Sequence, residues 1–255
     1  MRGLSPRESE WLLDRAAAAR RVVVLSGAGM SAESGVPTFR QAQTGLWERF
    51  DPTMLATPDA WEADRPLVWA WYAWRLGLVR GVHPNAGHTA LAAWGRKARV
   101  DIVTQNVDDL HERAGSQVLA HLHGSLRAFR CEACAAPYDG PIEVPAEPVE
   151  RLDPPRCPDC RAAIRPGVVW FGEMLPSGAF DGAVDALLEA DLVLVVGTSG
   201  LVHPAAGLPD IARGHGVPVV EVNPQETPLS AGVDLSWRIT AAVGLPTLVD
   251  RLIEP

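Results

Sequence analysis

The four cysteines of this sequence stand in two pairs with the spacing C-x2-C, in the stretches "CEAC" (131–134) and "CPDC" (157–160). Two such pairs supply four thiolates, which is the ligand set of a closed tetrahedral zinc site. The alternative is a pair of disulfides or redox-active thiols, which an intracellular chain disfavours. Since four thiolates leave no ligand position open to water, we predict a structural zinc ion bound by Cys131, Cys134, Cys157 and Cys160.

A glycine-rich stretch, "SGAGMSA", follows the apolar run "RRVVVL", which we interpret as a buried strand. Gly27, Gly29 and Ala32 fit the pattern G-x-G-x-x-A, in which the backbone approaches a pyrophosphate and the next helix offers its N–H groups. Glycine-rich turns also end strands for steric reasons alone. An acidic residue at the end of a second strand is missing, so Asn223, after "VVEV", is the candidate for holding the adenosine ribose. The stretch predicts a variant Rossmann site.

A second cluster, "TQNVDDLHERAG", follows the apolar run "ARVDIV". Its Gln105, Asn106 and Asp108 stand where a doubly wound sheet binds ligands, at the carboxyl end of a strand. Amides and a carboxylate form hydrogen bonds to a ribose or a carboxamide. The alternative is that Asp108 only caps the helix that follows.

The stretch "HLHGS" supplies a candidate general base. His123 precedes Gly124, where backbone and ligand can come close, and a neutral imidazole takes up protons near pH 7. We interpret His121 as structural.

The stretch "WYAWR" (71–75) lies in a longer run with helical character. Tyr72 and Arg75 are three residues apart and share one face of a helix, as do Trp71 and Trp74. The phenol and the guanidinium either form a clamp for an anion or the ordinary edge of an amphipathic helix.

These residues require a framework of alternating strands and helices. Residues 6–20 form a predicted helix. Buried strands are predicted in "RRVVVLSGAG" (20–29), where the run ends in glycines, and at 98–104, 191–197 and 217–223. Helical patterns lie between them, in "AGHTALAAWG", "DDLHERAG" and "GAVDALLEA", and Asn85 is a good N-cap for the first. The fold class is therefore α/β, with a doubly wound parallel sheet. Two segments interrupt the pattern: a tryptophan-rich helical insertion (45–82) and an irregular module rich in proline and cysteine (126–167).

Composition limits the function classes. The chain has 255 residues, 47% of them hydrophobic, and a formal net charge of −8, which disfavours direct binding of nucleic acid. It has no apolar run long enough to span a membrane and no signal peptide at its start, so we expect a cytoplasmic protein. Among its 23 basic residues only Lys97 is a lysine.

Several motifs together carry a family resemblance. The stretches "GAGMSAESGVPTFR", "TQNVDDLHERAG", "HLHGS", the two cysteine pairs, "PGVVWFGE", "VGTSG" and "EVN" resemble the sirtuins in order and spacing over residues 20–250. Sirtuins are NAD-dependent protein-lysine deacylases. "LATP" (55–58) and the Tyr72–Arg75 pair resemble the class III branch typical of bacteria, and Thr38 stands where many relatives carry Asp.

The resemblance implies a Rossmann-like NAD-binding domain made of residues 1–44, 83–125 and 168–255. It also implies a smaller discontinuous domain made of the helical insertion and the zinc-binding module. NAD⁺ is consumed in the implied reaction: the acyl oxygen of an acylated lysine attacks the ribose carbon as nicotinamide leaves. His123 then deprotonates a ribose hydroxyl, and the acyl group passes to the sugar.

The resemblance also assigns site residues. It implies that the cofactor is bound by Gly27, Ala28, Gly29, Ser31, Ala32, Thr38, Phe39, Arg40, Gln105, Asn106, Asp108, Gly197, Thr198, Ser199, Asn223 and Ala241. The substrate is an acylated lysine of a protein or peptide, bound by Ala56, Tyr72, Arg75, Val168, Val169, Phe171 and Gly172. The segment around "VVWFGE" would pair with the peptide as a strand, although its apolar residues also suit a core strand.

Two other functions fit parts of the pattern. An ADP-ribosyltransferase or NAD hydrolase would use the same NAD site without an acyl-lysine tunnel. A zinc-ribbon nucleotide sensor would form no product. The resemblance specifies neither the oligomeric state nor the acyl group preferred in the cell.

Overall fold

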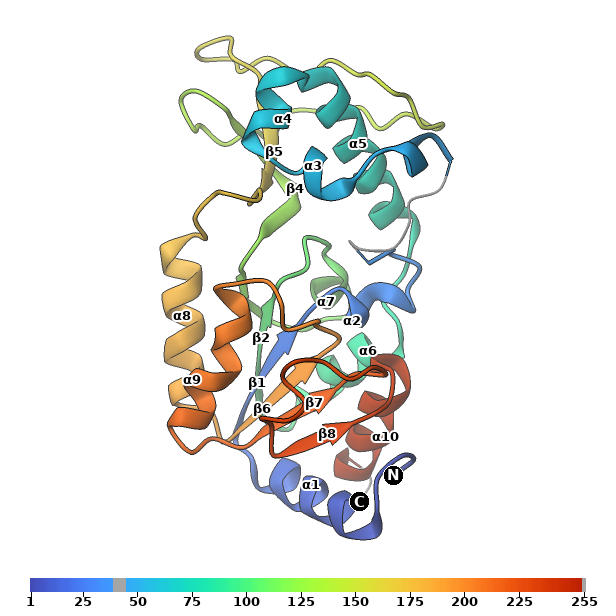
Figure 1. Ribbon diagram of the computed structural model, residues 1–255, viewed down its shortest axis with the longest axis vertical. Coiled ribbons are helices and arrows are strands. Elements are labelled where there is room, and N and C mark those ends of the chain that lie inside the picture. The colour runs from blue at the N-terminus through green and yellow to red at the C-terminus, as the bar shows by residue number, and fades with distance from the viewer. Residues whose placement is uncertain (39–44, 254–255) are drawn as a thin grey trace.

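The computed structural model describes residues 1–38 and 45–253. Its centre is a six-stranded parallel sheet in the order β3-β2-β1-β6-β7-β8 (Figure 1). The strands are β1 (Arg21–Ser26), β2 (Arg99–Thr104), β3 (Val118–His121), β6 (Leu192–Val196), β7 (Val219–Val222) and β8 (Leu235–Trp237). The strand order reverses between β1 and β6, so the prediction of a doubly wound sheet is confirmed.

Helices cover both faces of this sheet. One face packs on α1 (Pro6–Ala18), α6 (Ala86–Trp94) and α10 (Ala241–Ile253), and the other on α8 (Ser177–Leu188), the short helix η2 (Ala205–Gly207) and α9 (Leu208–Gly214). Side chains of β1 alternate between the two layers: Val22 and Val24 lie in the first core, Val23 and Leu25 in the second. Burial on both faces is the reason why these strands appear in the sequence as continuous apolar runs. We call the sheet and its helices the sheet half.

The two insertions come together in a small half at one end of the molecule (Figure 1). Its elements are η1 (Gly45–Arg49), α3 (Pro52–Leu55), α4 (Pro58–Ala63), α5 (Arg65–Gly81) and the antiparallel pair β4 (Gly124–Cys131) and β5 (Ile164–Val168). One hydrophobic cluster joins them, with Trp69 and Trp71 from the helical insertion and Ile164 and Val168 from the other chain segment. The two insertions, which are separate in the sequence, therefore share one core.

Two short helices complete the described elements, α2 (Gly29–Ala32) after β1 and α7 (Leu110–Arg113) after β2. The predicted cap of α6 is confirmed, because the side-chain oxygen of Asn85 accepts from the N–H groups of Gly87 and His88. The amide of Asn85 also donates to the carbonyl of Met30, 2.8 Å away, and to Ser34 Oγ, 3.0 Å away. The cap of α6 thereby holds the end of α2.

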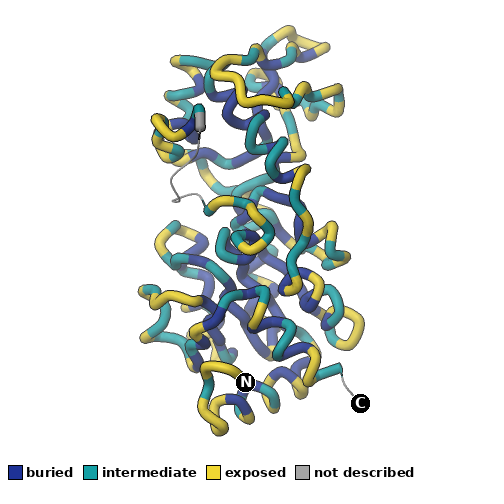
Figure 2. The backbone as a smooth tube through the Cα atoms, turned by 90° about the vertical axis from the view of Figure 1, so that its right-hand side faces the viewer, coloured by how far each residue is buried: buried dark blue, intermediate teal, exposed yellow. Residues whose placement is uncertain are grey.

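All predicted strands and helices are found within a few residues of their expected limits, whereas β3, β4, β5, β8, α9 and α10 were not predicted. Buried strands alternate with exposed loops along the chain, and long exposed stretches lie in the small half (Figure 2). Among the described residues, no helix has the length and apolar character needed to cross a bilayer.

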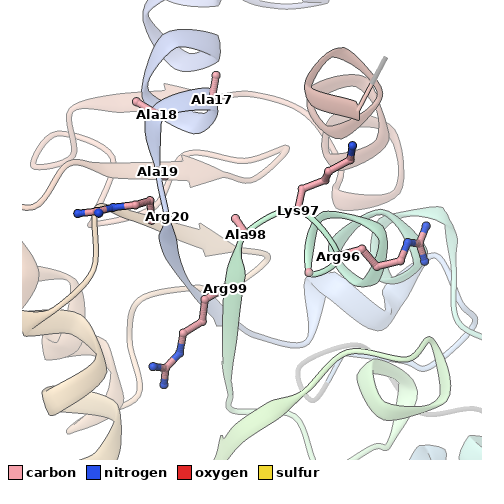
Figure 3. Close-up of a pocket in the computed structure, with 9 residues that line it drawn as sticks. Ala17, Ala18, Ala19, Arg20, Arg96, Lys97, Ala98 and Arg99 are labelled. Carbon is pink, nitrogen blue, oxygen red and sulfur yellow. The ribbon is translucent and has the colours of Figure 1, made fainter. Parts of the chain in front are cut away.

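A shallow depression of about 580 Å³ lies at the amino ends of β1 and β2. Arg20 and Arg99 extend to one side of it, and Arg96 and Lys97 to the other (Figure 3). The cations diverge, and Arg99 is paired with Asp101 at 3.0 Å. The candidate active site lies beyond the opposite, carboxyl ends of the strands.

Candidate active site

The loops after β1 and β6 pack directly on each other. Gly29 N–H donates to the carbonyl of Gly197 over 2.7 Å, and Gly27 N–H donates to that of Val196 over 2.9 Å. A Cβ added to Gly27 would lie 2.8 Å from Cα of Thr198, and one added to Gly29 would lie 2.8 Å from Cα of Gly197. Gly197 itself has φ +60°, a conformation that glycine adopts without strain. The glycines of the predicted motif are therefore required already by the contact between the two loops.

The helix that follows the glycine motif is a single turn, and the side chain of Ala28 gives it no cap. Ser31 in this turn is buried, and Ala32 and Thr38 are half-buried. Phe39 and Arg40, which were also predicted to contact the cofactor, lie outside the described residues.

The loop after β2 is fastened to both neighbouring loops. The amide of Asn106 donates to the carbonyl of Gly27 and to Ser31 Oγ, both at 3.1 Å. The amide of Gln105 donates to Thr198 Oγ1, also at 3.1 Å. The predicted amide cluster and the glycine motif are thus brought together at the switch point of the sheet.

Asp108 lies in the same loop and is buried. One of its carboxylate oxygens accepts from the N–H of Leu110, the first residue of α7, at 3.1 Å, although the N-cap position itself is Asp109, whose side chain makes no capping bond. Burial raises the pKa of this carboxyl group above its ordinary value. Capping and ligand contact are compatible, because a carboxylate has a second oxygen.

His123 follows β3 and is half-buried. Its Nδ1 lies 3.0 Å from the carbonyl oxygen of Gln105, which can only accept, so Nδ1 carries the proton and Nε2 keeps its lone pair. Burial lowers the pKa of His123, which keeps the ring neutral near pH 7. Gly124 has φ +72°, and a Cβ there would meet the carbonyl oxygen of Gly167 at 2.1 Å. The glycine after the histidine is therefore required by the close approach of the Gly124 and Gly167 backbones.

His121 has a structural place, as predicted from the sequence. Its Nε2 lies 2.6 Å from a carboxylate oxygen of Glu112, and its Nδ1 lies 3.1 Å from the carbonyl of Asn106. The ring joins α7 to the amide-bearing loop.

The residues predicted near the adenosine end also converge. The amide of Asn223 donates to the carbonyl of Thr198 at 2.9 Å, and its oxygen accepts from Gln225 N–H at 3.1 Å. Ser199 is next to this contact in the chain, and Ala241 is buried at the start of α10. Asn223 therefore lies against the same β6 loop that contacts the glycine motif.

Tyr72 and Arg75 lie on α5 in the small half. Tyr72 is buried, and its hydroxyl accepts from the indole N–H of Trp170 over 3.0 Å. Arg75 is half-buried, with its guanidinium carbon 4.9 Å from the ring centre of Trp71. Burial raises the pKa of Tyr72 to about 12 and lowers that of Arg75. Both packing among the tryptophans and a polar pair on one helix face are thus present.

The residues of the segment predicted to bind a peptide differ in how far they are buried. Val168 ends β5 with its side chain in the small core, so the core interpretation holds for this residue. Val169 is half-buried, whereas Phe171 and Gly172 are exposed. Val169 N–H donates to the carbonyl of His123, and Phe171 N–H donates to that of Ala56, both at 2.9 Å. The segment links the predicted base to the "LATP" loop.

A buried network below the amide loop was not predicted. Ser26 Oγ donates to Thr104 Oγ1 at 2.9 Å and lies 3.0 Å from His111 Nε2, and Asn106 N–H donates to the same Thr104 oxygen. The His88 ring lies edge-on to the His111 ring, 4.8 Å between centres. Burial lowers the pKa of His88 to about 4 and that of His111 to about 3. His111 lies inside the motif "DDLHERAG", so this motif was the sequence signal that could have pointed to the network.

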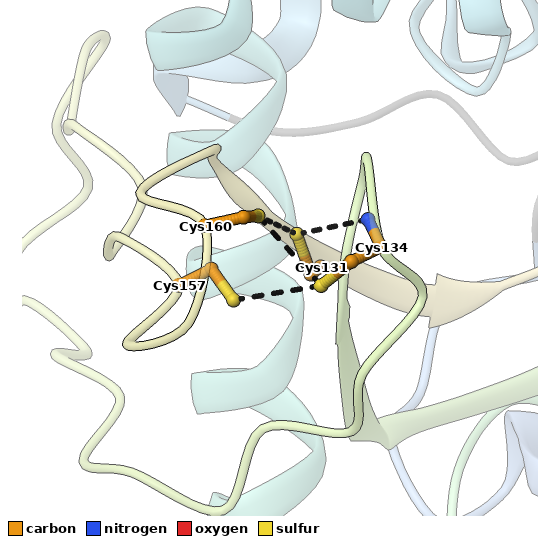
Figure 4. Close-up of side chains that lie close together, drawn as sticks. All are labelled: Cys131, Cys134, Cys157 and Cys160. Atoms are coloured by element: carbon orange, nitrogen blue, oxygen red, sulfur yellow. Dashed lines mark hydrogen bonds between the residues drawn. The ribbon is translucent and has the colours of Figure 1, made fainter.

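The four cysteine sulfurs converge at the end of the β4–β5 pair (Figure 4). All lie within 4.8 Å of one another, with Sγ distances of 3.3 Å between Cys131 and Cys160 and 3.8 Å between Cys134 and Cys157. Sulfurs on a tetrahedral zinc ion at about 2.3 Å would be roughly 3.8 Å apart. The cluster therefore fits Zn²⁺.

The two cysteine loops have matching backbones. In the first, the N–H groups of Ala133 and Cys134 point at Cys131 Sγ, at 3.4 and 3.5 Å, and the Cys134 donor contributes most to lowering the pKa of that thiol. The residue after each pair has a positive φ, 58° at Ala135 and 68° at Arg161. Strained conformations of this kind persist only where the surroundings impose them, which is consistent with two equivalent metal-binding loops.

Comparison with known proteins now identifies the family. The model of the Sir2 family matches residues 27–204, which begin at Gly27 of the glycine motif and include His123 and all four cysteines. The chain belongs to the Sir2 family. Asn223 and Ala241 lie beyond the matched range.

Relatives of this Sir2 protein are similar over nearly their whole length. The NAD-dependent protein deacylase Sir2 of Mycolicibacterium smegmatis is 55% identical, over 92% of this chain and 97% of the relative. The NAD-dependent protein deacylase of Corynebacterium glutamicum is 50% identical, over 95% of each chain. Among solved structures, a Sir2 homologue in complex with NAD superposes with a TM-score of 0.87 at 45% identity, over 95% of this chain and 93% of that one. The Sir2 fold predicted from the motifs is confirmed.

A second solved structure shows a Sir2 protein with a deacetylated p53 peptide and 3'-O-acetyl ADP ribose. It superposes with a TM-score of 0.79 at 31% identity and covers 96% of each chain.

Proposed function

We propose that this Sir2 protein is an NAD-dependent protein-lysine deacylase that transfers the acyl group of a modified lysine to ADP-ribose and releases nicotinamide. The observation that carries the proposal is the place of His123. Its Nδ1 is held by the Gln105 carbonyl, and its own carbonyl binds Val169 of the exposed segment. The base therefore lies between the loops of the sheet half and the segment expected to bind a peptide. Relatives that are 50% and 55% identical carry the name of this activity.

The sheet half provides the groups that would hold NAD. The crowded glycines leave backbone without side chains where a pyrophosphate is expected, and Gly27, Ala28, Gly29 and Ser31 would contact it. Ala32 and Thr38 are proposed to contact the cofactor as well, and Phe39 and Arg40 to cover the reacting ribose. Gln105, Asn106 and Asp108 would hold the ribose and the carboxamide, and Gly197, Thr198, Ser199, Asn223 and Ala241 the adenosine half. When bound, NAD supplies a ribose carbon from which nicotinamide can leave.

His123 would act as the general base. Its unprotonated Nε2 takes a proton from a ribose hydroxyl, and the Gln105 carbonyl stabilises the imidazolium that results through Nδ1–H. The lowered pKa of His123 favours the unprotonated ring before the reaction. The cysteine cluster would hold zinc at the far side of the small half and contribute only rigidity.

The small half would bind the acyl-lysine. Val169, Phe171 and Gly172 would pair with the peptide backbone, with Val168 anchoring the segment in the core. A relative's complex with a deacetylated peptide supports this class of substrate. A cytoplasmic location suits such substrates. Tyr72 and Arg75 would bind the far carboxylate of a succinyl or malonyl group, beside the small side chain of Ala56.

The reaction is tested by incubating the protein with NAD⁺ and acetyl-, malonyl- and succinyl-lysine versions of one peptide. Mass spectrometry should show the free lysine peptide, nicotinamide and O-acyl-ADP-ribose. ADP-ribose attached to the peptide, or NAD⁺ consumption without any peptide, would instead support a transferase or a hydrolase on this scaffold. No product at all would support the sensor.

The acyl preference is tested by Arg75→Met. Loss of a charge-assisted hydrogen bond is worth roughly 1.5–3 kcal/mol, so the ratio of succinyl to acetyl activity should fall about 10–150-fold. Arg80→Met is the matched control, because Arg80 is exposed on the same helix. Equal losses on both peptides would make Arg75 a structural residue.

A further inference from the structure

The hydrogen bond between Trp170 and Tyr72 has a fixed direction. An indole N–H can only donate, so across the 3.0 Å contact the Tyr72 oxygen is the acceptor. The phenolic proton of Tyr72 is not used in this bond and is directed to a different acceptor. Because burial raises the pKa of Tyr72 to about 12, the phenol keeps that proton throughout the neutral range. Trp170 thus makes Tyr72 a donor toward any third group.

The indole is itself held by its own chain segment. One oxygen of Glu173 accepts from the backbone N–H of Trp170 at 2.9 Å. The two Glu173 oxygens accept from the two terminal guanidinium nitrogens of Arg165, at 2.7 and 2.9 Å. The guanidinium lies against the indole face, with its central carbon 3.4 Å from the ring centre. Arg165 and Trp170 are both buried, so these bonds form where water competes little.

The position of the indole relative to α5 is fixed from a second side. The Trp61 ring of α4 lies 5.6 Å from that of Trp170, between ring centres. The indole is therefore confined by Arg165 and Trp61, and its N–H meets a hydroxyl on the next helix. Tyr72 and Arg75 lie one turn apart on that helix, so the orientation of the phenol decides whether both donors can reach one anion.

We propose that Trp170 is a positioning residue for acyl selection: its indole N–H fixes the Tyr72 hydroxyl as a donor toward the carboxylate end of the acyl group. The Arg165–Glu173 pair holds the indole in the required orientation. The inference rests on the proposed function, in which Tyr72 and Arg75 receive that carboxylate. In this proposal Trp170 acts on the acyl group through Tyr72.

The test is Trp170→Phe, which keeps an aromatic ring in the core and removes the N–H. Kinetics on acetyl and succinyl versions of one peptide should show KM for the succinyl peptide raised about 3–10-fold, with kcat little changed, as expected for one neutral hydrogen bond. The ratio of succinyl to acetyl kcat/KM should fall by the same factor. Glu173→Gln, which weakens the Arg165 pair, should shift the ratio in the same direction by less.

A double-mutant cycle separates positioning from packing. If Trp170 acts through the Tyr72 hydroxyl, Trp170→Phe should not change the acyl ratio further in a Tyr72→Phe background. An undiminished effect in that background, or equal losses on both peptides in both variants, would overturn the proposal. If the wild type has no succinyl activity, or if Arg75→Met leaves the succinyl-to-acetyl ratio unchanged, the proposed substrate class has failed instead. If Trp170→Phe folds poorly, the acyl ratio of Glu173→Gln serves as the test, provided that this variant has a normal melting temperature.

Discussion

The sheet half and the small half differ in how their chains are held in place. In the sheet half, strands such as β1 and β6 bury side chains on both faces, and Val22, Val24, Leu192 and Leu194 have no exposed surface. In the small half, tryptophans fill one core, and residues 132–163 form no helix or strand beyond isolated bridges. That stretch begins directly after Cys131 and ends three residues after Cys160. Two of the four cysteines, Cys131 and Cys157, are part of the core.

This difference shows two ways to make a rigid site. The sheet half gains stability from buried apolar area, which is non-directional and tolerant of detail. The small half also has an apolar core, but it adds a few directional contacts: the four-cysteine cluster, the Arg165–Glu173 pair and the Trp170–Tyr72 hydrogen bond. We therefore expect the two halves to fail under different perturbations.

The largest effect should follow removal of zinc. Structural zinc contributes on the order of 10–16 kcal/mol of apparent binding free energy in zinc-finger peptides at neutral pH, and the residues between the cysteines form no helix or strand beyond isolated bridges. Chelation, or Cys157→Ser, should abolish amide protection in residues 131–164 while β1, β2 and β6 stay protected. Hydrogen exchange measured by mass spectrometry checks this. Loss of protection in both halves together would show that they form one cooperative unit and would break the comparison.

The second largest effect should be a loss of turnover without a loss of stability. His123→Ala should reduce turnover about 10²–10⁴-fold, the usual cost of losing a general base. Melting temperature, zinc content and NAD binding should stay near those of the wild type, because the half-buried ring contributes no core packing. His215→Ala, at an exposed histidine, is the matched control. Near-normal turnover in His123→Ala would remove the proposed base.

A smaller effect should appear in the sheet half as pH falls. His88 and His111 have pKa values lowered by burial to about 4 and about 3, from an ordinary value near 6.5. Their contribution to stability is fully present above pH 6.5 and is lost as pH falls toward those values, at about 1.4 kcal/mol per pH unit for each ring.

Urea unfolding at pH 7.0 and 5.5 measures this loss, and His111→Gln supplies the comparison. Gln keeps a polar group near Ser26 and cannot take up a proton, so the difference between the two pH values should shrink. The same pH dependence in the variant and the wild type would mean that His111 does not contribute to it.

The smallest effect is expected in a cysteine loop. Ala135 has φ 58°, a conformation that costs a non-glycine residue roughly 1–2 kcal/mol. Glycine avoids this cost, but part of the gain is offset because glycine makes the unfolded chain more flexible. Ala135→Gly should raise the stability of the zinc-bound protein by up to about 1 kcal/mol, measured by thermal unfolding. Ala133→Gly, in the same loop at a residue without a positive φ, should be neutral or destabilising. Identical changes in both variants would indicate that strain at Ala135 is absent.

Much of the sheet half was predictable because its signals are local. Apolar runs ending at Ser26, Thr104 and Val196 indicated parallel strands, and side chains after those strands meet at one edge. β8 gave no such signal, because a three-residue strand is too short to show a pattern. The spacing of the cysteines predicted their cluster for the same local reason.

Contacts between distant segments were not predictable from single motifs. The glycines of "SGAGMSA" suggested a ligand, whereas the structure shows that Gly197 and Thr198, about 170 residues later, already require them. Trp170 lies 98 residues from Tyr72, and their hydrogen bond exists only once both insertions share a core. The sequence segment "VVWFGE" suggested peptide contact for its neighbours and left Trp170 itself without a role.

Lys97, the chain's single lysine, is exposed just before β2 at the amino end of the sheet. His123 lies beyond the opposite end, and a six-residue strand separates the two by about 20 Å, more than a lysine side chain can reach. An acyl group on Lys97 therefore cannot enter the active site of its own molecule. Its removal would need a second copy, so the rate would grow with the square of the protein concentration, whereas every other basic side chain is an arginine that this reaction leaves untouched.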